Sequence, residues 1–594
     1  MLMALLNVAF LPSKFVRMIL PPETKSSFLS IRSFNVSSPT QCKASIKNSN
    51  HSQPIILRRS ANFKPSIWSY DYIQSLNSEY KEEKYTEQSK VLREEVRVML
   101  SNVENQLDQL ELIDLLQRLG VAYHFNEEIM NILDNIYSMD TCKRKKNLHA
   151  TALEFRLLRQ HGYNTSADVF VSFINETSNF KNCQSNDVEG ILSLYEASFH
   201  SFKDETILDE ARDLTFKFLK EYLTKKEYNH LSLLISHALE LPLHWRIPRW
   251  EAQWFINVYE RRQNMSLAIF QLAMLDFNIL QTIYQEELKY TSRWWKRTGF
   301  AEKLNFVRDR LVENFIWTVG TNFKPEFGTF RRVCTKVNSL ITTIDDIYDV
   351  YGTLEELELF TQAIDRWDPK TNDSLPEYLK VCFLTLYNFV NGLAYETLKE
   401  KGYYITPYLR KAWADICKSY LIEAKWYYQR HTPSLEEYME NGWISISAPV
   451  ILTHAYFLIP HSFNKEDLVY LKDNYFDIIR LSAIILRLAN DLGTYKRENE
   501  TGDIPKSIQC YMNETGSSEA AAREYVKSLM YTTWKKINEE AYNNSSLSRS
   551  FIDTAVNLAR MALCMYQHGD GHTIQDPEIK NRIISLIFQP IHDE

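Results

Sequence analysis

The sequence predicts an all-α protein made of two helical domains. Glycine (15) and proline (18) are scarce among 594 residues, whereas β and α/β folds need many turns. No stretch alternates polar and apolar residues as a half-buried strand does, and long segments repeat apolar residues at steps of three and four. A chain of this length also exceeds what one hydrophobic core supports, so at least two domains are expected.

Composition excludes several classes of protein. The formal charge is −7 and no basic block suits a nucleic-acid groove, so nucleic acid is not expected as a partner. The eight cysteines are scattered without a Cys-x-x-Cys pair, which argues against a zinc site or a disulfide scaffold and suits a reducing compartment. No apolar run reaches the length of a membrane span, so no membrane partner is expected, and a monomer is the default expectation.

Residues 1–57 differ in composition from the rest of the chain. They hold ten Ser and six Lys or Arg but a single acidic residue, Glu23. Leaders that are Ser-rich, basic and poor in acids are typical of organellar transit peptides. The run from Leu2 to Leu11 could instead belong to a secretory signal, but no positive charge precedes it and no clear small-residue cleavage site follows. We therefore predict a transit peptide for import into a plastid or a mitochondrion.

Residues 58–265 are predicted to form an N-terminal helical domain. Val96, Met99 and Val103 lie at three- and four-residue steps in a pattern that ends near Gly120. The domain contains no Asp-x-Asp-Asp sequence that could protonate an alkene, so no catalysis is expected there. Further helices are expected around residues 150–161, 188–201, 205–223 and 230–240.

The second domain is predicted to span residues 266–594 and to begin with an aromatic-rich helix from about Leu267 to Trp295. Arg308 and Arg310 follow. Two arginines at this spacing diverge on a helix but converge from a helix end or a loop, and arginine suits bidentate capture of phosphate oxygens. Surface salt bridges are the alternative for this pair.

Three carboxylates interrupt the apolar segment 344–351. Asp345 and Asp349 lie four residues apart and share one face of a helix, with Asp346 beside them. No basic residue lies within four positions on either side, and uncompensated carboxylates in an apolar segment are costly. Mg²⁺ held by one or two carboxylates plus substrate phosphates fits best. An exposed acidic helix face is the alternative.

A second set of oxygen-bearing side chains lies downstream. Asn490, Thr494 and Glu498 follow at steps of four and form one stripe along a helix. The alternative is that these are ordinary polar side chains on the surface of a helix. If the stripe faces the aspartates, it could complete a metal site in the core of a helical bundle. Arg487 lies on the same side, and Lys506 follows in a loop from which it could reach an anion.

Together these motifs resemble those of plant terpene synthases, of the plastid-targeted, class I monoterpene-synthase type. That family carries an aspartate-rich DDXXD motif, a second metal motif and an N-terminal tandem-arginine motif. Their counterparts are, in that order, Asp345-Asp346-x-x-Asp349; Asn490, Thr494 and Glu498; and Arg58-Arg59 followed after eight residues by Trp68. Arg308-x-Arg310 stands where the family places a diphosphate-binding pair.

The resemblance implies a catalytic C-terminal class I terpenoid-synthase bundle, a non-catalytic N-terminal α-barrel and an N-terminal lid that includes Arg58, Arg59 and Trp68. It implies three Mg²⁺ (or Mn²⁺) ions held by the two metal motifs, and hydrogen bonds from Arg308, Arg487 and Lys506 to the diphosphate. The implied reaction is ionisation of geranyl diphosphate with release of diphosphate. The product would be an acyclic or cyclic monoterpene, either an olefin such as myrcene, ocimene or limonene, or an alcohol such as terpineol or linalool.

A carbocation must be kept from water, so the rest of such a pocket should be apolar and aromatic. The residues considered for its wall are Trp317, Tyr420, Tyr566 and His572. Plain packing is the alternative for each, and the family match favours Trp317 and His572. Asn338 precedes Asp345 by two helical turns; it could hold a water for capture, giving an alcohol, or satisfy a backbone carbonyl.

Other enzymes and a non-enzyme remain as alternatives. A sesquiterpene synthase acting on farnesyl diphosphate is the nearest, although the leader argues against it. Chain-elongating prenyltransferases usually carry two aspartate-rich motifs, and a non-catalytic helical scaffold needs no complete ligand sets. One departure concerns the helix break near the diphosphate, where the family often has Gly before Pro449 and this chain has Ser447-Ala448.

Overall fold

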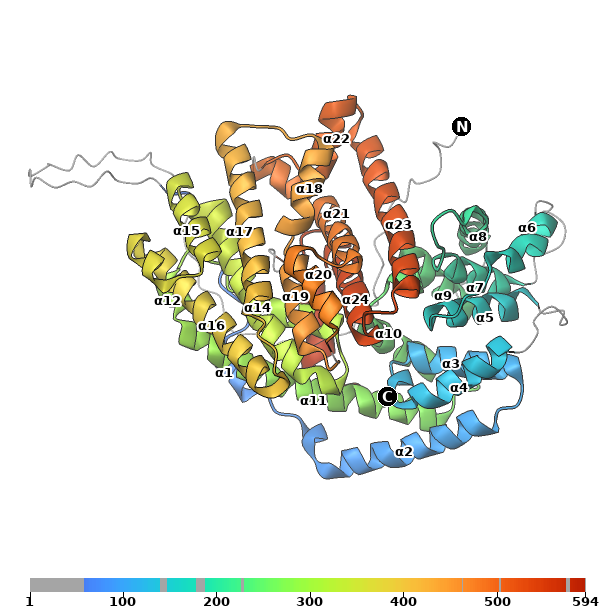
Figure 1. Ribbon diagram of the computed structural model, residues 1–594. Coiled ribbons are helices and arrows are strands. Elements are labelled where there is room, and N and C mark those ends of the chain that lie inside the picture. Colours follow the sequence, from blue (N-terminus) through green and yellow to red (C-terminus); the bar gives the residue numbers. More distant parts are fainter. Residues whose placement is uncertain are drawn as a thin grey trace, which may run out of the picture. The chain divides into compact units, whose positions relative to one another are not determined.

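The computed structural model describes residues 58–138, 147–177, 187–225, 229–461, 463–501, 504–572 and 577–592. The chain divides into two compact units, Met1–Arg58 and Arg59–Glu594, and the second contains every helix named below. Within the described ranges the regular elements are all helices, which confirms the all-α prediction (Figure 1). The predicted transit peptide lies outside the described residues.

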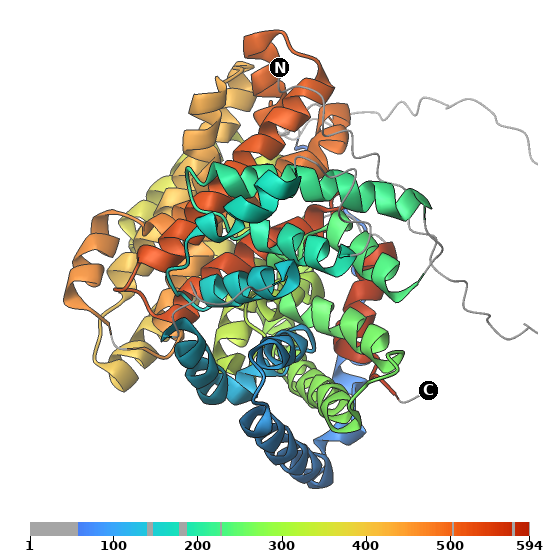
Figure 2. The same ribbon diagram turned by 90° about the vertical axis from the view of Figure 1, so that its right-hand side faces the viewer.

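The first helices of the second unit correspond to the region predicted as the N-terminal domain. In Figure 2 the helices of its middle part, in teal and green, face the viewer. Their bounds are α1 Tyr70–Ser75, α2 Glu83–Asn102, α3 Gln106–Arg118, α4 Asn126–Ser138, α5 Leu148–Gln160, α6 Val171–Thr177, α7 Val188–Ser198, α8 Thr206–Lys225, α9 His230–Glu240 and α10 Pro248–Glu260.

The helical pattern that ends near Gly120 is divided into two helices, α2 and α3. Val103 takes an extended conformation, and the Asn105 side chain accepts hydrogen bonds from the backbone N–H of Leu107 and of Asp108. A side chain that satisfies these first amides starts a new helix. The apolar steps continue across the break, so periodicity alone did not reveal it.

The remaining helices form the larger bundle, in which α14, α17, α19, α21 and α24 lie side by side (Figure 1). Their bounds are α11 Leu267–Thr298, α12 Phe300–Lys303, α13 Leu311–Thr321, α14 Gly328–Asp346, α15 Leu354–Arg366, α16 Glu377–Lys401, α17 Thr406–Gln429, α18 Leu435–Ser445, α19 Ala448–Leu458, α20 Lys465–Asp473, α21 Asp477–Thr501, α22 Ser507–Thr515, α23 Glu519–Asn543, α24 Arg549–Tyr566 and α25 Pro577–Ile583.

The 32-residue helix α11 is the longest of these helices and ends at Gly299, which takes the left-handed conformation that glycine adopts most easily. In the described part of the chain, the stretch Leu267–Lys303 alone has the length and composition of a membrane span, and 78% of its most apolar window is buried in the protein. The expectation that no apolar run reaches that length is corrected for this stretch. Its apolar residues contact α2, α13 and α14, so core packing accounts for its composition.

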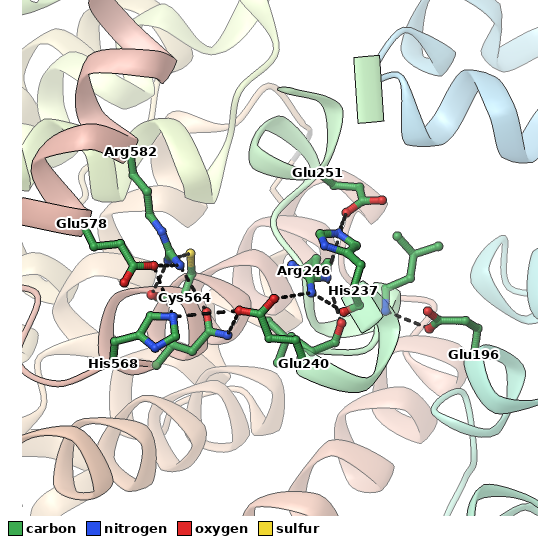
Figure 3. A network of polar contacts seen from close by, with 12 residues as sticks. Glu196, His237, Glu240, Arg246, Glu251, Cys564, His568, Glu578 and Arg582 are labelled. Carbon is green, nitrogen blue, oxygen red and sulfur yellow. Dashed lines mark hydrogen bonds and ion pairs between the residues drawn. The ribbon is translucent and has the colours of Figure 1, made fainter. Parts of the chain in front are cut away.

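A network of polar contacts joins α9 and α10 to the C-terminal end of the chain (Figure 3). Glu251 accepts hydrogen bonds from Arg118 at 2.7 Å and pairs with His237 at 2.7 Å. Arg246 continues the network to Glu240, the last residue of α9. Such buried charges are tolerated because each is paired.

Two buried histidines lie where α7 and its following loop meet α23 and α24. The rings of His200 and His244 are 4.0 Å apart between centroids. His244 Nε2 lies 2.7 Å from the Oδ1 atom of Asn538, and Arg560 lies 3.3 Å from its Nδ1. Burial, and then the Arg560 charge, lower the pKa of His244 from 6.5 to about 3, and burial lowers that of His200 as well.

We predict that this contact weakens in acid. Above about pH 6.5 both histidines are neutral in the folded and the unfolded chain, so their contribution to stability is complete. Below it the unfolded chain takes up protons that the folded chain does not, and His244, whose pKa falls to about 3, lowers the free energy of unfolding by about 2 kcal/mol at about pH 5. Thermal unfolding midpoints measured from pH 8 to pH 5 should fall less steeply in His244→Asn than in the parent. An exposed-residue variant, His431→Asn, should keep the parent slope; equal slopes in all three proteins would contradict the prediction.

Candidate active site

The bundle encloses a cavity of about 1110 Å³. Side chains from α13, α14, α17, α18, α19, α21 and α24 line it, together with the segment 59–67. The structure brings to this one cavity the predicted residues Arg59, Arg308, Arg310, Trp317, Asn338, Asp345, Asp346, Asp349, Tyr420, Arg487, Asn490, Thr494, Glu498, Lys506, Tyr566 and His572.

The three aspartates lie where α14 ends. Asp345 and Asp346 are its last residues, and Asp349 lies in the π-helical turn Ile347–Tyr351 that follows. Such turns are rare and occur most often at functional sites. Asp349 is exposed, Asp345 is half-buried and Asp346 is only 1% exposed. Asp346 is therefore the most enclosed of the three carboxylates.

Arg308 compensates the charge of this segment from a distance in sequence. Its backbone N–H donates to Asp346 at 2.8 Å, its Nε lies 2.9 Å from the same carboxylate, and its guanidinium also pairs with Asp345. Burial raises the pKa of the Asp346 carboxyl to about 7, and the Arg308 charge opposes that shift. No basic residue lies near the aspartates in the sequence, so the pairing with Arg308 could not be predicted from the residues around them.

The opposite wall is α21. Thr494 donates to the carbonyl of Asn490 at 2.9 Å, so the two ligand candidates lie on adjacent turns of the same helix. Arg487 donates to Asp491 at 2.7 Å and also contacts Asn490. Asp491 is fully buried and further accepts hydrogen bonds from Tyr438 of α18, at 2.9 Å, and from the backbone of Ser507 in α22. Asp491 therefore anchors this wall to its neighbours.

The donor set on the two walls suits a hard divalent cation. It consists of oxygens from carboxylates, an amide and a hydroxyl, which Mg²⁺ and Mn²⁺ prefer. Among the described residues no three His, Cys, Asp or Glu side chains gather into a group that could hold a metal ion. The candidate oxygen ligands lie on two separate walls of the cavity, one formed by the end of α14 with the turn after it and the other by α21.

Aromatic rings form part of the cavity wall below the metal motifs. The Trp317 ring centroid lies 6.1 Å from that of Tyr566 and 6.4 Å from that of His572. Burial and the Arg308 charge lower the pKa of His572 to about 3, which keeps its imidazole neutral. Asn338 donates to the carbonyl of Asn314 at 3.3 Å, while its Oδ1 has no hydrogen-bond partner within the part of the chain that the structure describes.

The segment that follows Arg58 crosses the same cavity. The Arg59 guanidinium lies 4.3 Å from the ring centroid of Tyr427, and Arg308 lies 5.2 Å from that of Phe63. Trp68 does not line the cavity; its indole N–H donates to Glu313 of α13 at 3.3 Å. Arg58 belongs to the first unit of the chain, so its part in a lid stays a prediction.

The sequence did not identify several polar residues that line the cavity. Asn314, Glu423, Arg497 and Asp570 come from four different elements, and none belongs to a local cluster of like residues. Asp570 stands in the sequence Gly569-Asp570-Gly571, between the two predicted wall residues Tyr566 and His572.

The helix break near Pro449 lies at Ser447. Ser447 has a φ of +74°, in the left-handed region, while Ala448 already belongs to α19. The residue that needs the glycine-like conformation is thus two positions before the proline, and Ala448 needs no positive φ. A non-glycine residue in this conformation costs about 1–2 kcal/mol, and Ser447 lines the cavity.

An all-helical fold with oxygen ligands on two walls and cationic donors above an aromatic cavity defines an enzyme for metal-dependent chemistry on an organic diphosphate. Residues 67–239 match the terpene synthase N-terminal domain, and residues 296–536 match the terpene synthase family metal binding domain. The chain belongs to the terpene synthase family.

The chain is similar to proteins of known activity. It is 55% identical over 556 residues to the chloroplastic myrcene synthase of Quercus ilex, covering 93% of each chain. A solved limonene synthase with 2-fluorolinalyl diphosphate shares 46% identity at a TM-score of 0.87, covering 90% of this chain and all of that one. An isoprene synthase from Populus x canescens, with three Mg²⁺ ions and dimethylallyl-S-thiolodiphosphate, shares 44% identity at a TM-score of 0.80, covering 88% and 99%.

Backbone strain at Ser447 leads to a stability prediction. Ser447→Gly relieves the strain of the left-handed conformation but raises the conformational entropy of the unfolded chain. The free energy of unfolding should therefore change by less than about 1 kcal/mol. Ser447→Val places a β-branched side chain at positive φ and should lose about 2 kcal/mol more than the glycine variant. Denaturant unfolding of the two variants measures the difference, and equal stabilities would show that the break adopts another conformation.

Proposed function

We propose that the protein is a divalent-metal-dependent monoterpene synthase that ionises geranyl diphosphate, releases diphosphate and forms an acyclic or cyclic monoterpene. The observation that carries the proposal is that one cavity combines oxygen-bearing side chains from two walls with the cationic side chains of Arg308, Arg487 and Lys506 and with an aromatic wall. Catalysis is assigned to residues 266–594, and residues 58–265 are assigned a non-catalytic role. The leader 1–57 would direct the chain to the chloroplast, as the name of the Quercus ilex relative indicates for that protein.

The polar end of the cavity would hold the diphosphate. Arg308 and Arg487 supply planar guanidinium donors and Lys506 a compact ammonium, which suit phosphate oxygens. Three Mg²⁺ ions, or Mn²⁺, would be held by Asp345, Asp346, Asp349, Asn490, Thr494 and Glu498. When bound, the metal neutralises the charge that develops on the leaving diphosphate as the carbon–oxygen bond breaks.

The aromatic end would receive the carbocation. Ring faces of residues such as Trp317 and Tyr566 attract a cation with about 0.5–2 kcal/mol each. The same side chains exclude water, which would otherwise capture the cation before it rearranges. A neutral imidazole at His572 can accept the proton that a cation loses when an olefin forms.

The test is an incubation of the purified protein with geranyl diphosphate and Mg²⁺, followed by analysis of the headspace volatiles. We expect monoterpenes, and no product after removal of divalent metal with EDTA. Asp349→Asn should lower kcat by about 10²–10³ because it removes a charged ligand that acts on the transition state. Glu355→Gln, which changes an exposed carboxylate on the next helix, should retain activity. Sesquiterpenes formed only from farnesyl diphosphate would establish the alternative substrate, and no volatile from either substrate would favour a non-catalytic scaffold.

Asn338 gives a separate prediction about the product. Its amide oxygen is buried, is not hydrogen-bonded to any described residue and belongs to a cavity-lining side chain, so it could hold a water for capture of the cation. Asn338→Ile removes this acceptor and should shift the product mixture from alcohols toward hydrocarbons. Gas chromatography of the volatiles measures the ratio, and an unchanged ratio would exclude Asn338 from this role.

A further inference from the structure

The segment from Gln567 to His572, which follows α24, is held on one side by residues that do not line the cavity. Gln567 donates to Glu240 of α9 at 3.0 Å, and His568 lies 3.2 Å from Glu578 of α25. Arg582 pairs with the same glutamate at 2.7 Å (Figure 3). Neither Gln567 nor His568 lines the cavity. These contacts hold the beginning of the loop against the rest of the chain.

The other side of this segment takes part in an ion pair between Asp570 and Arg497. Asp570 lines the cavity and its side chain is only 3% exposed. Its Oδ2 lies 2.8 Å from Nη2 of Arg497 on α21, and its Oδ1 accepts the backbone N–H of His572 at 3.2 Å. Arg497 follows the ligand candidate Thr494 by three positions and precedes Glu498, whose carboxylate lies 3.9 Å away. One carboxylate therefore connects the helix of the second metal motif to the residue that faces Trp317.

We propose that Arg497 is a positioning residue for the reaction: it neutralises Asp570 inside the cavity and thereby fixes His572 against the aromatic wall. The inference rests on the proposed function, since it assumes that the cavity receives a diphosphate and then a carbocation. A buried carboxylate is costly without a paired cation, and it would repel an anionic substrate in the same cavity. Arg497 removes both difficulties while leaving the backbone contact of Asp570 to His572 in place.

The arrangement predicts how substitutions combine. Arg497→Gln leaves the Asp570 charge without the guanidinium, so both substrate binding and the placement of His572 should suffer. Asp570→Asn removes the charge and the ion pair but keeps an oxygen that can accept the His572 amide. Once either member is changed, changing the other should cost little more, because residues that act through one interaction are not additive. Arg497→Lys keeps the charge and should recover most of the loss.

The experiment is a double-mutant cycle in the full-length protein, with Arg497→Gln, Asp570→Asn and the double variant. We expect each single variant to lose about tenfold in kcat/KM, with more water-captured product, and the double variant to lose about tenfold rather than a hundredfold. Hydrogen–deuterium exchange of the peptide that covers residues 567–572 should accelerate in Arg497→Gln and return toward the parent rate in Arg497→Lys. The control is Lys496→Gln, which changes the exposed basic neighbour and should alter neither readout.

Additive losses in the cycle, or loop exchange that Arg497→Gln leaves unchanged, would overturn the proposal. The exchange measurement needs no substrate, so it separates the two hypotheses. A parent protein that makes no volatile product would refute the proposed function, and the exchange rates would still decide whether Arg497 fixes the loop.

Discussion

The pairing of buried carboxylates with arginines is the interaction on which the larger helical bundle and its cavity depend. Asp346 and Asp491 are 1% and 0% exposed, and each is reached by an arginine, Arg308 for the first and Arg487 for the second. Removing one partner from such a pair costs about 3–5 kcal/mol, because the other charge is left buried. Arg308 also joins the loop after α12 to the end of α14, so one contact both permits the burial and fixes the wall of the cavity.

Buried carboxylates paired with cationic side chains also occur in the N-terminal part of the chain. No catalytic chemistry was expected there, yet its last helices hold several buried charges in the network of Figure 3. Glu251 is shared by Arg118 and His237, and Glu240 reaches Gln567 at the start of the loop between α24 and α25. A domain without ligands of its own can therefore influence the site by holding the segment that borders it.

The all-helical class and the grouping of oxygen-bearing residues on each wall of the cavity could be predicted because both depend on spacing along a continuous stretch of helix. Asp345 and Asp349, or Asn490 and Thr494, lie one helical turn apart, and the chain itself places such residues together. The partners of these residues could not be predicted in this way. Arg308 meets Asp346 across 38 positions, and that contact depends on how two elements pack rather than on either sequence.

Local conformation was predictable only where a side chain carries the signal. The break between α2 and α3 is made by the Asn105 cap, a residue type that the sequence shows, although the continuing apolar steps concealed it. The break at Ser447 has no such signal, since serine rarely takes a left-handed conformation. Only the structure shows that the residue in the left-handed conformation lies two positions before Pro449.

The polar and apolar ends of the cavity differ in which residue types can occupy them. Charges at the polar end must be paired, which restricts the residues that can occupy those positions. Along the apolar end, α13 and α14 share a seam in which Asn314 contacts Ser339 at 3.5 Å and Thr342 at 3.4 Å, while Asn338 donates to the Asn314 backbone. These side chains are all buried, and Asn314, Asn338 and Thr342 line the cavity, so a change in one alters the hydrogen bonds of its neighbours. Because about 1.4 kcal/mol between competing barriers changes a product ratio tenfold, under the proposed function even a small displacement in this seam would change the product mixture.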